Sequence, residues 1–113
     1  MLAKPHRFHG YNALNFAHKQ GRVVRGNQIT LKYARNDRRQ TYRVAVVVSK
    51  KVSKSAVTRN RIRRRVYEAV RLQPPVTGPY DLIFMVYSED AASVEYQALE
   101  QTIGQLLRKA NVV

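Results

Sequence analysis

Apolar residues at every second position predict strands in the middle of the chain. Ile29, Leu31 and Tyr33 alternate with polar neighbours, which is the period of a half-buried strand. Residues 22–24 are a candidate for a short strand before it. The valine-rich run over residues 41–49 is β-branched on both faces, so we expect a central strand there, covered on both sides.

Spacings of three and four residues predict three helices, over residues 11–20, 55–72 and 93–109. Ser93 is expected to cap the last of them. The middle helix has one apolar stripe that can lie on a sheet, formed by Ile62, Val66, Ala69 and Val70. A further interior strand is expected at residues 80–87. This order of elements predicts an α/β sandwich in which helices pack on a mixed sheet, with the strand order left open.

The composition fits one folded domain over residues 1–113. Of the 113 residues 44% are hydrophobic, and cysteine is absent, which excludes disulfides and thiolate metal sites. The three histidines lie near the N-terminus without carboxylates close in sequence, which argues against a metal held by protein ligands alone. No apolar run could span a bilayer, and the first residues lack the apolar centre of a signal peptide. We therefore expect a cytoplasmic protein without a membrane partner.

The balance of charge points to a polyanionic partner. The chain has 21 Lys and Arg against 7 Asp and Glu, a formal net charge of +14. Because the first acid is Asp37, the excess is spread over the N-terminal two-thirds and is not confined to a tail. Nucleic acid is therefore the leading partner.

The positive charge is densest between Lys50 and Arg65, where eight Lys or Arg occur with no acid before Glu68. Like charges one helical turn apart repel, so this cluster is a cost to the folded chain that a phosphate backbone would relieve. On a helical projection Arg59 lies beside the apolar stripe, and the residues that point away from it are Asn60, Arg61, Arg63, Arg64 and Arg71. The alternative is a solvated face that serves solubility, although such faces usually intersperse acids.

The acidic residues do not form a recognisable active site. Neither paired spacing nor a companion histidine for acid–base work is found among Asp81, Glu89, Asp90, Glu95 and Glu100. Glu89 and Asp90 are expected to form an acidic cap before the final helix, with binding of a hydrated divalent ion as the alternative. Glu68 is expected to form an exposed ion pair with Arg64 or Arg71. No catalytic residue is therefore expected in the protein.

The segment SKKVSKSAVTRNRIRRRVYEAVR, residues 49–71, closely resembles the signature of the protein subunit of bacterial ribonuclease P. A valine-rich strand leads into it, and an isolated Arg-Asn-Arg would carry no weight without this context. The matching residues are Ser49-Lys50-Lys51-Val52, Lys54, Ala56-Val57, Arg59-Asn60-Arg61 with Ile62 and Arg64, and Glu68. The resemblance extends to Arg7-Phe8, to Gly21 after the first helix, to the DLIF strand and to the final amphipathic helix. It covers nearly the whole chain in the same order.

The resemblance implies a fold and a function. The family fold is α-β-β-β-α-β-α around a four-stranded mixed sheet, with an unusual left-handed crossover into the arginine-rich helix. The catalyst is a large RNA, which uses Mg²⁺ to direct water onto one phosphodiester of precursor tRNA and so releases the 5′ leader. The implied partners are this catalytic RNA and precursor tRNA, with no obligate protein partner. The implied cofactor is Mg²⁺, bound mainly by the RNA and the substrate.

The resemblance also implies two sets of binding residues. The catalytic RNA would be contacted by Lys50, Lys51, Lys54, Arg59, Asn60, Arg61, Arg63, Arg64 and Arg65. The leader would lie in a cleft between the first helix and the sheet, with Phe8, Leu14, His18, Tyr33 and Tyr42 as candidate contacts. Leu14 and His18 occupy positions that are commonly aromatic in the family. Stacking, worth about 1–3 kcal/mol per base, is therefore expected to be weaker here or to come from other aromatics.

Several of these residues also fit a purely structural role, and other classes of protein share part of the pattern. Phe8 and Leu14 suit a core equally well, His18 suits a polar helix end, and the face on which Tyr33 lies is left open. A ribosomal protein would also be small, basic and free of cysteine, but it would be expected to have a basic extension. A protein-only nuclease would need clustered carboxylates. An RNA recognition motif would need aromatics where the strand YRVAVVVS has valines.

Overall fold

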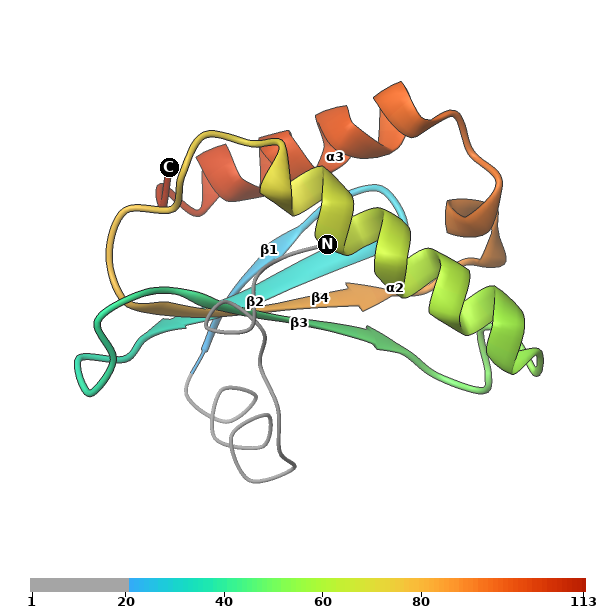
Figure 1. Ribbon diagram of the computed structural model, residues 1–113, viewed down its shortest axis with the longest axis horizontal. Helices are drawn as coiled ribbons and strands as arrows, with labels where there is room; N and C mark the ends of the chain where they lie inside the picture. The colour runs from blue at the N-terminus through green and yellow to red at the C-terminus, as the bar shows by residue number, and fades with distance from the viewer. Residues whose placement is uncertain (1–20) are drawn as a thin grey trace.

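A computed structural model describes residues 21–113 of the chain (Figure 1). Its elements are β1 (Arg22–Arg25), β2 (Ile29–Arg35), β3 (Arg43–Val48), α2 (Ala56–Arg71), β4 (Tyr80–Val86), the 3₁₀ helix η2 (Glu89–Ala92) and α3 (Tyr96–Lys109). The helix expected at residues 11–20 lies outside the described residues. From β1 onward the order of strands and α-helices is the predicted one, which confirms an α+β fold.

The four strands form one mixed sheet in the order β1-β2-β4-β3. β1 and β2 are antiparallel, as are β2 and β4, whereas β3 and β4 are parallel neighbours. A parallel pair needs a crossover connection, and α2 with its flanking loops provides it. Gln28 turns the chain between β1 and β2 with a positive φ of 63°, and the amide of Gly26 donates to the Ile29 carbonyl at 2.9 Å.

The prediction that residues 41–49 form a central strand was wrong, because β3 is an edge strand of the described sheet. Its apolar character has a different cause. Val44, Val46 and Val48 face the main core, and Ala45 on the opposite face is only 4% exposed. Cover on both faces therefore makes the strand valine-rich without a neighbouring strand on both sides.

The main core lies between the sheet and the two helices, which pack side by side on the same face (Figure 1). The predicted stripe of α2 is confirmed, since Ile62, Val66, Ala69 and Val70 are its buried residues. Ile103 and Leu107 of α3 are 0% exposed. Each such side chain stabilises the fold by about 1.5–3 kcal/mol relative to an exposed position, so the helices are held firmly on the sheet.

The ends of the helices differ in how they are capped. The Ser55 hydroxyl accepts from the amide of Thr58 at 3.2 Å and so caps α2. The predicted cap Ser93 is wrong, because α3 begins at Tyr96 after Glu95, and Ser93 instead ends η2. The short helix η2, capped by Ser88, takes up Glu89 and Asp90 and was not anticipated.

The C-terminal end of α3 is fixed by its backbone. Asn111 adopts a positive φ of 60°, its amide donates to the Arg108 carbonyl at 3.0 Å, and the amide of Val112 donates to the Leu107 carbonyl at 3.3 Å. This is the paired bonding of a Schellman motif, which satisfies carbonyls that a helix end leaves open. Val112 is 0% exposed, so the segment after the helix is anchored in the core.

Candidate nucleic-acid interface

The basic segment, which we define as residues 50–65, begins in a tight turn between β3 and α2. The amides of Val52 and Ser53 donate to the Ser49 carbonyl at 3.0 and 3.4 Å. Ser53 is buried, and its hydroxyl accepts from the Ser55 amide at 3.2 Å. Arg59 ties the first turn of α2 to this segment, because its Nη1 donates to the Ser53 carbonyl at 2.8 Å. The backbone that carries the lysines of the turn is therefore held beside the helix.

The structure divides the nine residues predicted to contact the catalytic RNA into two groups. Three are half-buried and donate hydrogen bonds within the protein, namely Arg59, Arg63 and Arg65. Six are exposed and form what we call the basic surface: Lys50, Lys51, Lys54, Asn60, Arg61 and Arg64. The turn and the first half of α2 thus bring these six residues to one end of the molecule.

Two arginines of α2 hold the η2 segment. Arg65 donates from Nη1 to the Ala91 carbonyl at 2.7 Å and from Nη2 to the Val94 carbonyl, and its guanidinium lies 6.0 Å from the centre of the Tyr96 ring. Arg61 donates from Nε to the Ala92 carbonyl at 2.8 Å. Burial, and next the charge of Arg61, lower the pKa of the Arg65 guanidinium. These contacts were missed from the sequence, because a helical projection does not show which loop packs beside the helix.

The basic surface has little compensating negative charge. The first turn of α2 contains no acid, although the amino end of a helix has a positive partial charge that acids usually neutralise. The ion pairs found in residues 21–113 join Arg35 to Asp37, Arg43 to Asp81 and Arg71 to Glu68, all outside the basic segment. Helix dipole and side chains therefore add to one positive field.

Glu68 forms the helix-surface ion pair expected for it, with Arg71 as the partner. The Arg71 Nε donates to Glu68 Oε1 at 2.9 Å. This bond is the main cause that lowers the pKa of Glu68 to about 2. The carboxylate stays ionised at neutral pH, as expected of a surface pair and not of a general acid.

Of the five residues predicted to contact the leader, Phe8, Leu14 and His18 lie outside the described residues. Tyr33 and Tyr42 are half-buried and pack against the main core. Burial raises the pKa of the Tyr42 hydroxyl. The question left open for Tyr33 is thereby answered, since it shares the helix-covered face with Leu31.

The opposite face of the sheet presents the residues that alternate with this core. Lys32 on β2, Ile83 on β4 and Ala45 on β3 stand in one row across the strands. Thr30, Met85 and Val47 form the next row. Lys32 faces away from the main core, as its alternation with Leu31 and Tyr33 predicted.

The carboxylates do not fit a protein-held Mg²⁺. Among residues 21–113 no group of three or more His, Asp or Glu side chains is placed to hold a metal ion. Asp37, Glu68 and Asp81 are each engaged with an arginine. The donors present thus suit ion pairs, and no chemical step is assigned to a metal bound by the described part of the protein.

Comparison with known proteins then decides the family. The family model for ribonuclease P matches residues 2–111. The chain belongs to the ribonuclease P family. It therefore has the general role of a component of an endoribonuclease complex in tRNA processing. No helix within residues 21–113 is both long and apolar enough to cross a membrane.

Several curated ribonuclease P proteins are similar in sequence. The ribonuclease P protein component of Roseiflexus castenholzii is 38% identical over 96 residues, which cover 84% of this chain and 77% of that protein. The component from a Cyanothece species is 30% identical over 129 aligned positions, covering 100% of this chain and 98% of its own. For Chloroflexus aurantiacus the identity is 45% over 74 residues, 65% of this chain and 54% of the relative.

Solved structures of ribonuclease P proteins share the fold. A mutant of the Staphylococcus aureus protein superposes with a TM-score of 0.85 at 23% identity, covering 97% of this chain and 92% of the other. The Thermotoga maritima protein gives a TM-score of 0.76 at 18% identity, covering 91% and 96%. The described part of the chain therefore has the four-stranded mixed sheet and the two helices that the family resemblance predicts.

Proposed function

We propose that the chain binds the catalytic RNA of ribonuclease P through its basic surface and assists Mg²⁺-dependent removal of the 5′ leader from precursor tRNA. The observation that carries the proposal is the basic surface itself. Six exposed residues gather at the start of α2, and within residues 21–113 no acid pairs with any of them. A member of the ribonuclease P family has an RNA as the natural polyanion for such a surface.

The arrangement of α2 suits phosphate binding. Arg61 uses Nε for its bond to the Ala92 carbonyl, which holds the guanidinium in place while its Nη groups can meet a phosphate. The side-chain oxygen Oδ1 of Asn60 accepts from Arg63 Nη2, which leaves the side-chain nitrogen Nδ2 of Asn60 to donate to a phosphate. Arg64 is exposed and lies on the same side of the helix as Asn60, four residues earlier. Held donors lose less conformational freedom on binding than free ones.

In this proposal the active site belongs to the RNA partner. The protein neutralises phosphates where the catalytic RNA meets precursor tRNA, and Mg²⁺ is bound by the two RNAs. Recognition of the leader, with Phe8, Leu14, His18, Tyr33 and Tyr42 as candidate contacts, favours the leader-bearing substrate over the mature product. Within the described part, the lack of a suitable carboxylate cluster supports this division of labour.

Substitutions on α2 test the RNA contact. Arg61→Ala and Arg64→Ala each remove one phosphate ligand, and we expect each to weaken binding to the catalytic RNA and to reduce the magnitude of the slope of log affinity against log salt by about 1. Filter binding over a salt series measures both quantities. Arg71→Ala is the matched control, since Arg71 is exposed on the same helix but pairs with Glu68. Equal affinity and slope for all three variants and the unaltered chain would refute the proposal.

A further inference from the structure

A basic cleft lies at the opposite end of the sheet from the basic surface. It is a cleft of about 610 Å³ between β1, β2, the start of β4 and the end of α3, and its polar and aromatic lining comprises Arg22, Tyr33, Arg35, Tyr80, Lys109 and Asn111. We propose that this cleft binds a segment of single-stranded RNA, as a contact separate from α2. The inference rests on the RNA-binding role proposed above. Of the cleft residues only Tyr33 is also a candidate leader contact, and none belongs to the basic surface.

Sheet register places the cleft. Arg22 of β1 stands opposite Tyr33 of β2, and Arg35 at the end of β2 stands opposite Tyr80 at the start of β4. The basic surface follows the end of β3, which runs parallel to β4, so the two regions lie at opposite ends of the strands. In Figure 1 the end of α3 and the start of α2 are correspondingly far apart.

The walls of the cleft are firmly positioned. Tyr33 and Tyr80 are half-buried and pack against the main core. Lys109 is the last residue of α3, and the Schellman turn at Asn111 fixes where this helix ends. Three elements, β1, β2 and α3, therefore each contribute one cation to a cleft that two tyrosines also line.

The charge of the cleft suits a polyanion. None of its lining residues is acidic, and the neighbouring acid Asp37 accepts from Arg35 Nε at 2.7 Å. The Arg35 guanidinium lies 5.9 Å from the centre of the Tyr80 ring. Asp37, and next Tyr80, raise the pKa of Arg35. Asp37 and Tyr80 thus hold the planar guanidinium of Arg35 in place. Arg22 and Lys109 are exposed and line the same cleft.

The size and the aromatic floor favour a single strand. The volume falls in the range of clefts that enclose small ligands, about 300–1,000 Å³, which suits a short run of nucleotides. A duplex is instead recognised over a broad surface of many base pairs, whereas unpaired bases stack on tyrosine rings and arginine planes. Arg22 and Lys109 can meet successive phosphates while a base lies over the Arg35 guanidinium or over Tyr80.

A pair of matched double variants tests this assignment on the full chain. Arg22→Ala with Lys109→Ala removes two cations of the cleft, whereas Arg38→Ala with Arg108→Ala removes two exposed cations that do not line it. The probe is a ten-residue oligouridylate, and binding is followed by the amide resonances of Tyr80 and Asn111 in the ¹⁵N-labelled protein. We expect these resonances to shift with the probe, with at least a fivefold loss of affinity in the cleft variant and less than twofold in the control.

Three results would overturn the inference. The first is a set of shifts confined to residues 50–65, and the second is an equal loss of affinity in both double variants. The third is that inorganic phosphate at the same concentration causes the same shifts, which would mean an anion site without a strand. Reconstituted cleavage of precursor tRNA reports on the proposed function separately. A chain that assists cleavage without cleft shifts contradicts this inference alone, and cleft shifts without assistance contradict the proposed function alone.

Discussion

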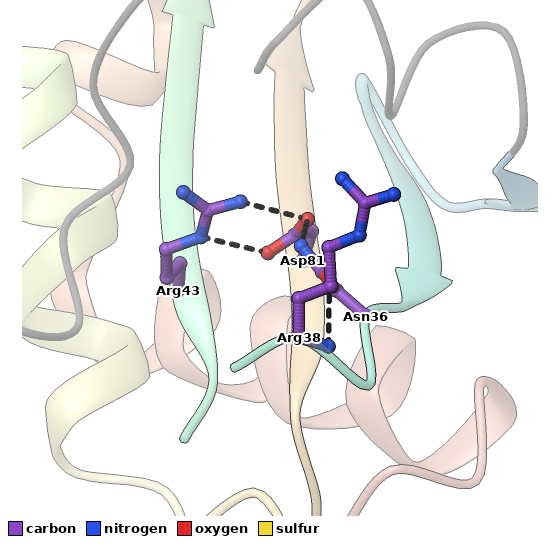
Figure 2. A network of polar contacts seen from close by, with 4 residues as sticks. All are labelled: Asn36, Arg38, Arg43 and Asp81. Carbon is purple, nitrogen blue, oxygen red and sulfur yellow. Dashed lines mark hydrogen bonds and ion pairs between the residues drawn. The ribbon is translucent and has the colours of Figure 1, made fainter. Parts of the chain in front are cut away.

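At the scale of single residues, Asp81 is the charged side chain that is buried among the described residues. It is 1% exposed and accepts from Arg43 Nε and Nη2, both at 2.9 Å, and from Asn36 Nδ2 at 3.0 Å (Figure 2). The side-chain oxygen Oδ1 of Asn36 in turn accepts from the Arg38 amide at 3.2 Å. One buried carboxylate therefore joins β4 to β3 and orders the loop that leads from β2 toward β3.

Replacing this carboxylate should destabilise the protein strongly. Asp81→Ala removes the acceptor of three hydrogen bonds in a buried site, and we expect a loss of about 3 kcal/mol in the free energy of unfolding. Asp37→Ala breaks a pair whose side chains are 58% and 78% exposed and should cost less than about 1 kcal/mol. Urea unfolding measures both. Similar losses in the two variants would show that the Asp81 network does not hold the strands together.

A second prediction separates two adjacent arginines by role. Arg65 donates to two carbonyls of the η2 segment, whereas Arg64 is exposed. Arg65→Ala should lower the free energy of unfolding by about 1.5–3 kcal/mol, the range for hydrogen bonds to a charged group. Arg64→Ala should leave stability within about 0.5 kcal/mol and weaken RNA binding instead. Thermal unfolding together with filter binding of both variants checks this, and the reverse assignment of effects would contradict it.

At the scale of elements, the start of α2 depends on a cap that α3 lacks. Ser55 bonds to the Thr58 amide, whereas the residue before α3, Glu95, makes no such bond. Ser55→Ala should therefore cost about 1 kcal/mol of stability, and Ser93→Ala, two residues before Glu95, should cost clearly less. Denaturant midpoints of the two serine variants decide the matter. A larger loss for Ser93 would restore the cap first expected from the sequence.

Sequence pattern predicted these elements where one period dominates. The spacing of Ile62, Val66 and Ala69 located α2 and its buried face, because a helix places them on one side whereas a strand would turn Ala69 to the opposite face. The start of α3 was misplaced, since Ser93 has the chemistry of a cap but lies in the turn that ends η2. The edge position of β3 was missed because apolar pattern reports cover of the faces and not neighbours within the sheet.

The candidate site was predicted in composition but not in arrangement. The density of arginine between Lys50 and Arg65 identified the segment, and the family resemblance gave it a partner. That Arg65 turns to η2 while Arg64 faces outward depends on a contact between segments 26 residues apart. The cleft lined by Arg22, Arg35 and Lys109 likewise forms only because the fold brings these distant residues together. No local sequence motif predicts it.

At the scale of the whole molecule, positive charge lies at both ends of the sheet. The net charge of +14 should then make RNA binding strongly dependent on salt, because bound phosphates release counterions. If about five phosphates are neutralised, the slope of log affinity against log salt should be roughly −4. A salt titration with the catalytic RNA measures it. A slope near zero would instead indicate an apolar interface.

The central claim is that this chain assists an RNA catalyst without an active site of its own. Its most direct test is cleavage of precursor tRNA at low Mg²⁺ by the matching catalytic RNA, with the protein, without it, and with the protein alone. We predict correct release of the 5′ leader only when RNA and protein are both present. Cleavage by the protein alone, or no gain when the protein is added to the RNA, would contradict the account.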